Sequence, residues 1–203
     1  MSLVRGQRTL SGDQMKSQDI VILLKLVSLQ EQENSSLLGS ADWSSGREDL
    51  YSVRGLGVSL GISKTEVSAS INRSLEVGLA TKDRKLGRVK PNRRNLYDFI
   101  SHGLKFVFPA KPGAPERGIP TAFSAPMLQD QLLSAGIDIY VWPYAQGKER
   151  GLSVKPLFKS VPEAVQRDER LYEYLALVDA IRLGKPRESN LAAEQLKERL
   201  LRR

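Results

Sequence analysis

Apolar residues spaced three and four apart predict a first helix over residues 15–32. The residues that follow this spacing are Ile20, Leu23, Leu24 and Val27, with further apolar side chains between them. Apolar coverage this broad is typical of a scaffold helix that is buried on most sides. The next residues, 33–45, are polar and rich in Ser, Asn and Gly, so we expect a loop there.

Residues 52–80 predict two short helices that meet at a tight turn. The first ends at Leu60, and Gly61 can adopt the left-handed conformation that closes a helix. Ser63 is expected to cap the second helix, with Glu66 completing a capping box. Residues four apart predict its inward face, namely Val67, Ile71 and Leu75. Its free face then carries hydrogen-bonding side chains, those of Lys64, Thr65, Ser68, Asn72 and Arg73.

Basic residues are concentrated directly after these helices. The chain has 31 Lys+Arg against 23 Asp+Glu, a formal net charge of +8. Seven basic residues against one acidic residue give residues 82–94 a net charge of +6; the basic ones are Lys82, Arg84, Lys85, Arg88, Lys90, Arg93 and Arg94. Such a block is either a solvated loop or a phosphate-binding surface, and its place beside a polar helix face favours phosphate contact.

Residues 15–90 resemble the helix-turn-helix of winged-helix bacterial transcription regulators. The resemblance rests on a small residue inside the first helix, a Gly-Ile-Ser turn, the spaced apolar seam and a Glu-Val-Gly-Leu ending before a basic hairpin. These features are Gly57, residues 61–63, Val67/Ile71/Leu75 and residues 76–79. Gly55 and Gly57 each cost about 1 kcal/mol of helix propensity relative to Ala. Close helix packing would offset that cost at Gly57.

The resemblance implies that the second helix enters the major groove of DNA and that the following wing contacts the phosphate backbone. Lys64, Thr65 and Ser68 would then reach base edges. The expected phosphate contacts are Asn72, Arg73, Arg84, Lys85 and Arg88. With the cap and the rest of the basic block, the full expected DNA-binding set is Ser63, Lys64, Thr65, Ser68, Asn72, Arg73, Lys82, Arg84, Lys85, Arg88, Lys90 and Arg93. The wing, with its tip at residues 86–87, is either a hairpin or a plain loop.

The second half of the chain begins after one more predicted helix, over residues 92–108. Its apolar face consists of Leu96, Phe99, Ile100, Leu104 and Val107. Five prolines and two glycines within residues 109–126 predict an irregular connector rather than helix or sheet. We therefore divide the chain into a winged helix-turn-helix DNA-binding domain, residues 1–108, and an α+β region for oligomerisation or partner binding, residues 109–203.

The C-terminal region is predicted to hold a β-hairpin and a helical hairpin. Residues 137–144 and 152–158 predict short or edge strands, and their aromatic residues Tyr140, Trp142 and Tyr144 either line a ligand pocket or cap a small core. One helix is expected from Pro162 to residue 183 and another from Ser189. This helical pair serves either as a dimerisation or partner-binding arm or as closure of the chain's own core. The predicted fold class is α+β, mainly α.

The chemistry that the sequence offers is poor in catalytic groups. No cysteine is present, which excludes disulfides, thiolate nucleophiles and zinc ribbons. His102 is the single histidine, and the Gly55-Leu-Gly57 run lies inside a predicted helix instead of a phosphate-binding loop. We therefore expect no enzymatic activity, no cofactor and no metal site.

The sequence also predicts a cytoplasmic protein. The longest apolar run, residues 20–24, is far short of the roughly 20 residues that span a bilayer. The N-terminus lacks the continuous apolar stretch of a signal peptide. No membrane association is expected.

Together these observations predict a sequence-specific, double-stranded-DNA-binding bacterial transcription regulator, acting as a homodimer. The alternative is an antitoxin-like or adaptor module whose basic face binds an acidic partner protein. Residues 103–109, 117–122 and 177–182 are similar to small winged-helix proteins encoded beside nucleotidyltransferases in antitoxin-like pairs, which implies such a partner. RNA is a third possible ligand, less favoured because aromatic stacking platforms are not evident near the basic block.

Overall fold

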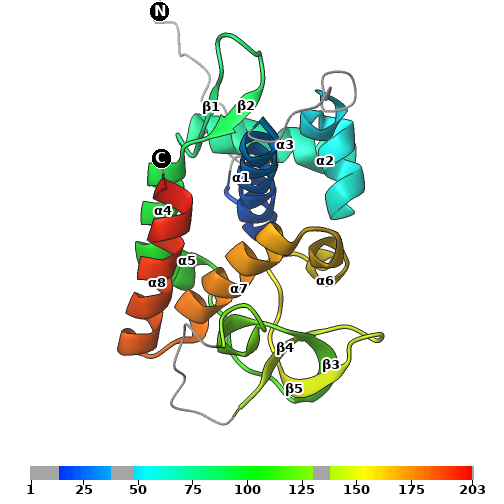
Figure 1. Cartoon of the computed structure of the whole chain (residues 1–203), viewed down its shortest axis with the longest axis vertical. Helices are drawn as coiled ribbons and strands as arrows, with labels where there is room; N and C mark the ends of the chain where they lie inside the picture. The colour runs from blue at the N-terminus through cyan, green and yellow to red at the C-terminus, as the bar shows by residue number, and fades with distance from the viewer. Residues whose placement is uncertain (1–13, 38–47, 130–137, 203) are drawn as a thin grey trace, which may run out of the picture.

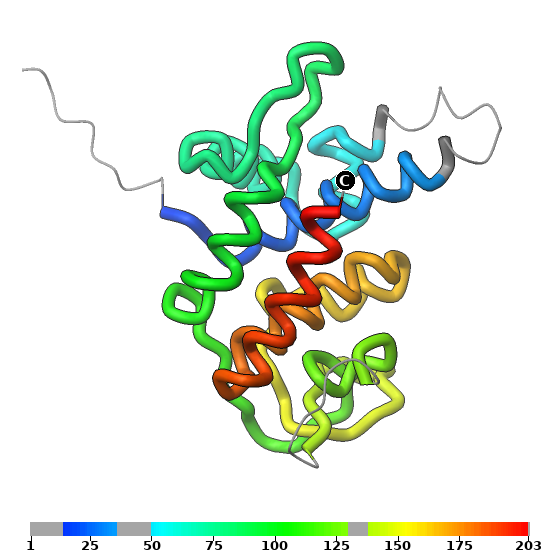
Figure 2. Tube along the Cα trace, turned by 60° about the vertical axis from the view of Figure 1, so that its left-hand side comes forward, coloured from blue at the N-terminus to red at the C-terminus, as the bar shows by residue number. Residues whose placement is uncertain are grey.

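The fold is α+β and mainly helical, as the sequence predicts (Figure 1). The computed structural model describes residues 14–37, 48–129 and 138–202. Helices fill the middle of the molecule, between a two-stranded hairpin at one end and a three-stranded barrel at the other (Figures 1 and 2). Within the described residues, no helix combines the length and apolar character needed to cross a membrane.

Helix α1 (Ser17–Leu37) is the centre of the N-terminal half. Its buried apolar side chains are Ile20, Val21, Ile22, Leu23, Leu24, Leu26, Val27 and Leu29. This burial on nearly every side confirms the predicted scaffold helix. The helix continues five residues beyond its predicted end, so the predicted loop is wrong for residues 33–37. The rest of that predicted loop, residues 38–45, lies outside the described residues.

Helices α2 (Val53–Leu60) and α3 (Lys64–Glu76) follow the short 3₁₀ helix η1 (Glu48–Tyr51) and begin and end where the sequence predicts. Gly61 ends α2 in the left-handed conformation, with φ 64° and ψ 33°. Ser63 caps α3 by accepting a hydrogen bond from the backbone N–H of Glu66 at 3.3 Å. The full capping box is wrong, because the Glu66 carboxylate instead accepts hydrogen bonds from Lys16 and Gln18.

The turn between α2 and α3 packs tightly against both halves of the chain. A Cβ atom at Gly57 would lie 2.7 Å from the carbonyl oxygen of Ile62, which confirms the close packing predicted at this glycine. The Gly57 carbonyl in turn accepts a hydrogen bond from the Ile62 N–H at 3.0 Å. From the C-terminal half, the Ser160 hydroxyl donates to the carbonyl of Leu60. The turn is thereby fixed from two sides.

Strands β1 (Ala80–Lys82) and β2 (Val89–Pro91) pair antiparallel directly after α3. Helix α4 (Arg93–His102) follows, capped by the side chain of Asn92. The single helix predicted over residues 92–108 is interrupted at Gly103, after which a short α5 (Leu104–Val107) begins. Val107 is half exposed, so it does not belong to the buried face that the sequence predicts.

Strands β3 (Pro115–Pro120), β4 (Tyr140–Pro143) and β5 (Glu149–Ser153) close into a small barrel. The irregular connector predicted over residues 109–126 is therefore wrong, since its middle is a strand. The two prolines of β3 stand at its ends, where a missing N–H donor disturbs the ladder least. The predicted β-hairpin is wrong as well: β4 and β5 run parallel, and each pairs antiparallel with β3.

Two glycines allow the barrel strands to approach this closely. A Cβ atom at Gly118 would lie 2.0 Å from the carbonyl oxygen of Trp142. One at Gly151 would lie 2.3 Å from the carbonyl oxygen of Ile139. Any side chain at these positions would open the barrel, because both obstacles are backbone atoms.

The C-terminal helices are α6 (Val161–Ala164), the 3₁₀ helix η3 (Val165–Arg167), α7 (Glu169–Leu183) and α8 (Pro186–Leu201). The predicted helix from Pro162 is therefore interrupted at Asp168, and the last helix begins three residues before Ser189. The helical hairpin of α7 and α8 is confirmed (Figure 2). Its apolar stripe closes the chain's own core, with Ala192, Leu196 and Leu200 fully buried.

Two buried carboxylates join α7 to the rest of the fold. Asp168 caps α7 through the Leu171 N–H at 3.0 Å and binds Lys25 of α1 at 2.7 Å. Asp179 accepts hydrogen bonds from the Trp142 indole of β4 at 2.6 Å and from Thr121 at 2.9 Å. Burial raises the pKa of Asp179, while the nearby Arg182 acts in the opposite direction. Trp142 thus belongs to the core, which favours the core-capping alternative over a ligand pocket at this residue.

Buried apolar side chains on both sides of residue 109 belong to one hydrophobic cluster. In it, α1 packs against α3 from the first half and against α7 from the second. The boundary predicted at residue 109 therefore separates two stretches of chain that share a core.

We expect Gly57→Ala to lower the free energy of unfolding by about 1–3 kcal/mol, because the new methyl group meets the backbone of the turn. Urea denaturation followed by circular dichroism measures this loss. The neighbouring Val58 is exposed, so Val58→Ala is the matched control and should change stability by less than about 0.5 kcal/mol. Equal stability of the two variants would contradict the close packing at the turn.

Candidate nucleic-acid interface

The outer face of α3 carries five of the twelve predicted DNA-binding residues. Ser63, Lys64, Thr65, Ser68 and Asn72 are all exposed. Their exposure follows from the spacing of the inward residues, since Val67 is fully buried and Ile71 and Leu75 pack against the core. Apart from Ser63, which caps the helix, these side chains present donors and acceptors to solvent.

Arg73 does not lie on this face, so the prediction that it contacts a phosphate is wrong. Its side chain is only 5% exposed and lies on the inward face of α3 beside Ser70 and Ser74. The guanidinium donates two hydrogen bonds to the carboxylate of Asp19 in α1, at 2.9 and 2.6 Å. The hydrogen bonds to Asp19 raise the pKa of Arg73, so this group stays charged.

Glu66 is the only acidic residue in the first turn of α3. Its carboxylate lies 3.2 Å from the ammonium group of Lys16 and also accepts a hydrogen bond from the Gln18 amide. These two hydrogen bonds are the main reason that the pKa of Glu66 is lowered. Lys16 thereby neutralises a charge that would repel a polyanion at this end of α3. Neither partner can be predicted from the sequence, because Lys16 and Gln18 stand about 50 residues earlier, just before and at the start of α1.

The basic block forms a true hairpin, which decides between the two forms considered for it. We call residues 80–91 the basic hairpin. Asp83 fixes its tip by accepting hydrogen bonds from the N–H groups of Lys85 at 2.8 Å and Leu86 at 3.0 Å. These hydrogen bonds lower the pKa of Asp83. Gly87 takes a positive φ of 65° at the turn.

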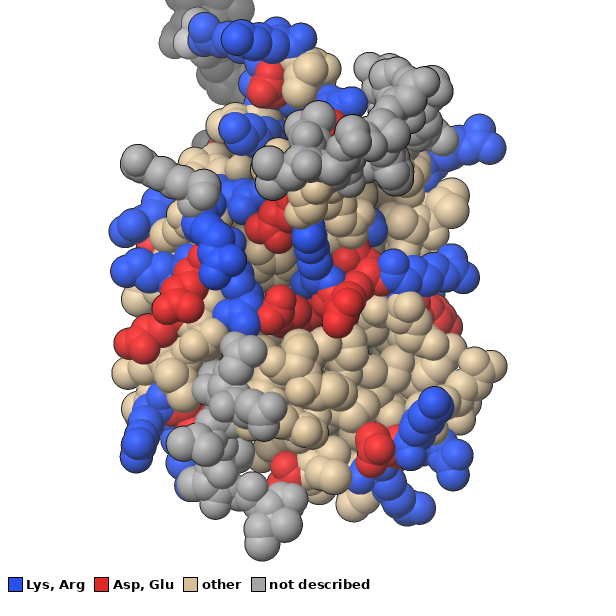
Figure 3. Space-filling model, viewed as in Figure 1, with Lys and Arg blue, Asp and Glu red and all other residues tan. Residues whose placement is uncertain are grey.

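Four predicted cations of the basic hairpin are exposed, and none forms an ion pair with a residue that the structure describes. They are Lys82, Arg84, Lys85 and Lys90. Figure 3 shows Lys and Arg side chains at the end of the molecule that bears the hairpin, acidic and basic side chains mixed across its middle, and further Lys and Arg side chains at the barrel end. The hairpin follows α3 after three residues, and both elements lie at the same end of the molecule (Figure 1).

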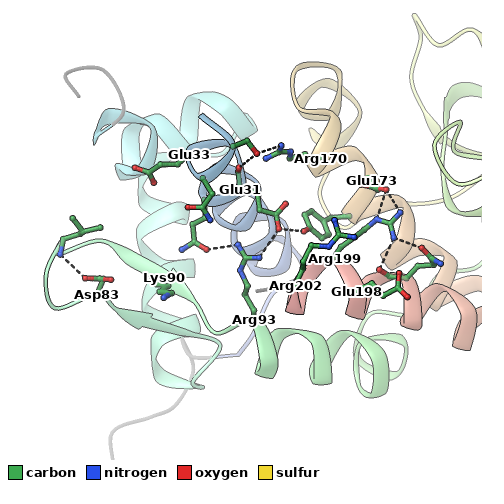
Figure 4. Close-up of a pocket in the computed structure, with 16 residues that line it drawn as sticks. Glu31, Glu33, Asp83, Lys90, Arg93, Arg170, Glu173, Glu198, Arg199 and Arg202 are labelled. Atoms are coloured by element: carbon green, nitrogen blue, oxygen red, sulfur yellow. Dashed lines mark hydrogen bonds and ion pairs between the residues drawn. The ribbon is translucent and has the colours of Figure 1, made fainter. Parts of the chain in front are cut away.

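Arg88 and Arg93 belong to the same basic block but point toward the protein. The Arg88 guanidinium lies 4.5 Å from the centre of the Tyr51 ring and 3.4 Å from the carboxylate of Glu33. Arg93 binds Glu31 at 3.0 Å (Figure 4). Both arginines therefore join the hairpin and α4 to the second half of α1. These two guanidinium groups, which the sequence predicts to bind DNA, are instead engaged by side chains of the protein.

His102 is exposed in the last turn of α4. The described residues hold no group of three His, Cys, Asp or Glu side chains arranged to bind a metal ion.

Comparison with known proteins adds no family to this picture. No protein-family model, curated protein or solved structure matches the chain. Any functional conclusion must therefore come from the geometry of the interface itself.

Replacing Arg73 tests whether its role is to hold α3 against α1. We expect Arg73→Met to lower the free energy of unfolding by about 3–5 kcal/mol, because it leaves the buried carboxylate of Asp19 without its positively charged partner. Pairing it with Asp19→Leu should restore most of the loss. Asn72→Ala, on the exposed face, is the control and should change stability by less than about 0.5 kcal/mol in the same urea titration. An Arg73→Met variant as stable as the parent would contradict the buried pair.

Proposed function

We propose that the protein is a sequence-specific, double-stranded-DNA-binding transcription regulator, with a winged helix-turn-helix as its DNA-binding unit. The observation that carries the proposal is the exposed polar face of α3 beside the unpaired cations of the basic hairpin. In this proposal α2 and α3 form the helix-turn-helix, α3 is the recognition helix and the basic hairpin is the wing. The cytoplasmic location expected from the sequence goes with this function.

The dimensions of α3 suit the major groove. Its 13 residues make a helix about 20 Å long, and the groove is about 12 Å wide. Lys64, Thr65 and Ser68 occupy the first turn and a half, which is the part of a recognition helix that reaches base edges. Lysine can donate to guanine, and hydroxyl groups both donate and accept, so these residue types can discriminate between base pairs.

The remaining exposed residues supply phosphate contacts. We assign this role to Asn72 on α3 and to Lys82, Arg84, Lys85 and Lys90 on the basic hairpin. Arg73, Arg88 and Arg93 are left out, because each is engaged with a carboxylate of α1. The corrected set is smaller than the sequence predicts, and every member is exposed to solvent.

We also propose a homodimer, and the single argument for it is that regulatory DNA sites are commonly two-fold symmetric. A two-fold dimer would place its two recognition helices about 34 Å apart, one turn of the DNA. The α7–α8 hairpin no longer argues for a dimer, since Leu196 and Leu200 pack inside the same chain.

Removing the free cations of the hairpin tests the phosphate contacts. We expect the triple variant Lys82→Ala, Arg84→Ala and Lys85→Ala to bind all duplexes at least about tenfold more weakly. The slope of log affinity against log salt should become shallower by up to about three units, because fewer counterions are released. Fluorescence anisotropy with a random-sequence duplex between about 50 and 200 mM salt measures both quantities.

The matched control removes the same charge from the opposite end of the molecule, with Lys111→Ala, Lys148→Ala and Lys155→Ala, all at exposed positions. This control should keep the parental affinity and slope. If both triple variants lose affinity equally, the hairpin has no special role. A third outcome is that the protein binds no duplex but binds an acidic protein, and that this binding is lost when Arg84 and Lys85 are replaced. This outcome would favour the partner-protein alternative over the regulator.

Substitutions on α3 should change sequence preference instead of overall affinity. We expect Lys64→Gln or Ser68→Ala to alter discrimination at one or two base pairs by about 1–3 kcal/mol. Selection of bound fragments from genomic DNA, followed by competition with single-base variants of the selected site, measures the change. Lys197→Gln, at an exposed position of α8, is the control and should leave the selected site unaltered. Unchanged preference in both α3 variants would contradict base reading by this helix.

A further inference from the structure

A groove of about 990 Å³ lies between the basic hairpin and the two C-terminal helices (Figure 4). Side chains line it from the second half of α1, from the basic hairpin, from the start of α4, from the first turns of α7 and from the end of α8. Its size matches the largest pockets that hold small molecules in proteins. The proposed DNA contacts make no use of this groove except at Lys90.

Most acidic side chains of the groove are already engaged. Glu31 binds Arg93 at 3.0 Å and accepts a hydrogen bond from the Tyr174 hydroxyl at 2.7 Å. Glu173 binds Arg199 at 2.7 Å. Asp83 accepts two backbone N–H groups at the hairpin tip. Glu31 and Glu173 are therefore each balanced by an arginine, whereas Asp83 is held by backbone N–H groups and keeps its negative charge.

Three cations of the groove are not balanced in this way. Lys90, Arg170 and Arg202 form no ion pair with any residue in the described part of the chain, whereas Glu198 is the remaining exposed carboxylate of the lining. Arg170 donates one hydrogen bond, from Nη2 to the Ser35 hydroxyl at 2.9 Å. Its other terminal nitrogen, Nη1, is buried and has no hydrogen-bond partner among the residues that the structure describes.

A buried guanidinium nitrogen without a partner is unfavourable, because a charged donor loses water and gains nothing in exchange. Arg170 also lines the groove, and guanidinium groups bind phosphate and carboxylate oxygens well, so a turn of this side chain toward a bound anion would give Nη1 a partner. Lys90 and Arg202 reach the same groove from the hairpin and from α8. The groove thus offers positive charge from three separate elements to one ligand.

We propose that this groove binds a small organic polyanion, carrying at least two phosphate or carboxylate groups, and that the bound anion weakens DNA binding. The second half of this inference rests on the proposed regulator function, while the first half does not. The anion would occupy Lys90 and place negative charge beside the basic hairpin, so the DNA phosphates would be repelled. Because coupling between two ligands is reciprocal, DNA would weaken anion binding by the same factor.

Isothermal titration of the full chain with pyrophosphate, and separately with citrate, tests the site and tells phosphate from carboxylate ligands. We expect one site per chain for at least one of them, and an affinity at least about tenfold weaker in the double variant Arg170→Gln and Arg202→Gln. The control removes two exposed arginines outside the groove, with Arg117→Gln and Arg187→Gln, and should bind as the parent does. Absence of binding to both probes, or equal losses in both double variants, overturns the site.

Thermal unfolding of each variant shows that it is folded before titration. Arg202 is exposed at the end of α8, so Arg202→Gln alone still tests the site should substitution of Arg170 disturb folding. This single variant should also bind the anion more weakly than the parent, and unchanged binding there overturns its part in the site.

The regulatory half has its own measurement. Saturating anion should weaken binding of the parent protein to its selected duplex, but it should leave the Arg170→Gln and Arg202→Gln variant unaffected. That variant should bind DNA as well as the parent when the anion is absent. The hairpin triple variant separates the two proposals, because it should bind DNA at least about tenfold more weakly and keep pyrophosphate binding. Anion binding that depends on Arg170 without any DNA binding would overturn the regulator and retain the site.

Discussion

The orientation of α3 depends on the buried ion pair between Arg73 and Asp19. Two hydrogen bonds hold the guanidinium against α1, so the opposite face of α3 has to look outward. Similar joints continue through the molecule, since Lys25 of α1 binds Asp168 at the start of α7, and Asp179 of α7 binds Trp142 of the barrel. Three buried carboxylates thus connect α3, α1, α7 and the barrel in series. A buried charge without a partner costs several kcal/mol, so the relative positions of these elements are fixed more strictly than apolar packing alone would require.

The basic residues after α3 that are predicted to bind DNA fall into two groups, those paired with carboxylates of α1 and those exposed without a described ion pair. Arg88 and Arg93 turn toward Glu33 and Glu31 of α1, where they attach the hairpin and α4 to the scaffold helix. Lys82, Arg84 and Lys85 turn away and stay free of described carboxylates. The ion pairs of Arg88 and Arg93 anchor the hairpin, so its exposed cations keep a constant position relative to α3. Charge counted along the sequence therefore overstates the charge available to a polyanion.

Features governed by neighbouring residues could be predicted from the sequence, and features governed by distant partners could not. Gly61 and Ser63 act on their own turn, so the end of α2 and the start of α3 are predicted correctly. The burial of Arg73 could not be predicted from its own helix, because its partner Asp19 stands 54 positions earlier in the sequence. The barrel could not be predicted for a related reason. The prolines at both ends of β3 favour an irregular connector, and β4 and β5 can run parallel only because β3 pairs with both of them. The fold class depends on amphipathic spacing, which is why it is recovered.

The hydrogen bond from Ser160 to Leu60 has a consequence for how this protein can be divided. The turn that positions α3 is braced by a residue from the far half of the chain, and α1 shares its core with α7. A fragment ending near residue 108 would expose to solvent the apolar side chains of α1 that pack against α7, and it would lack the hydrogen bond from Ser160 to the turn. The half that carries α3 therefore depends on the other half for its folded form, and any change to the exposed face of α3 has to be made by altering side chains within the intact chain.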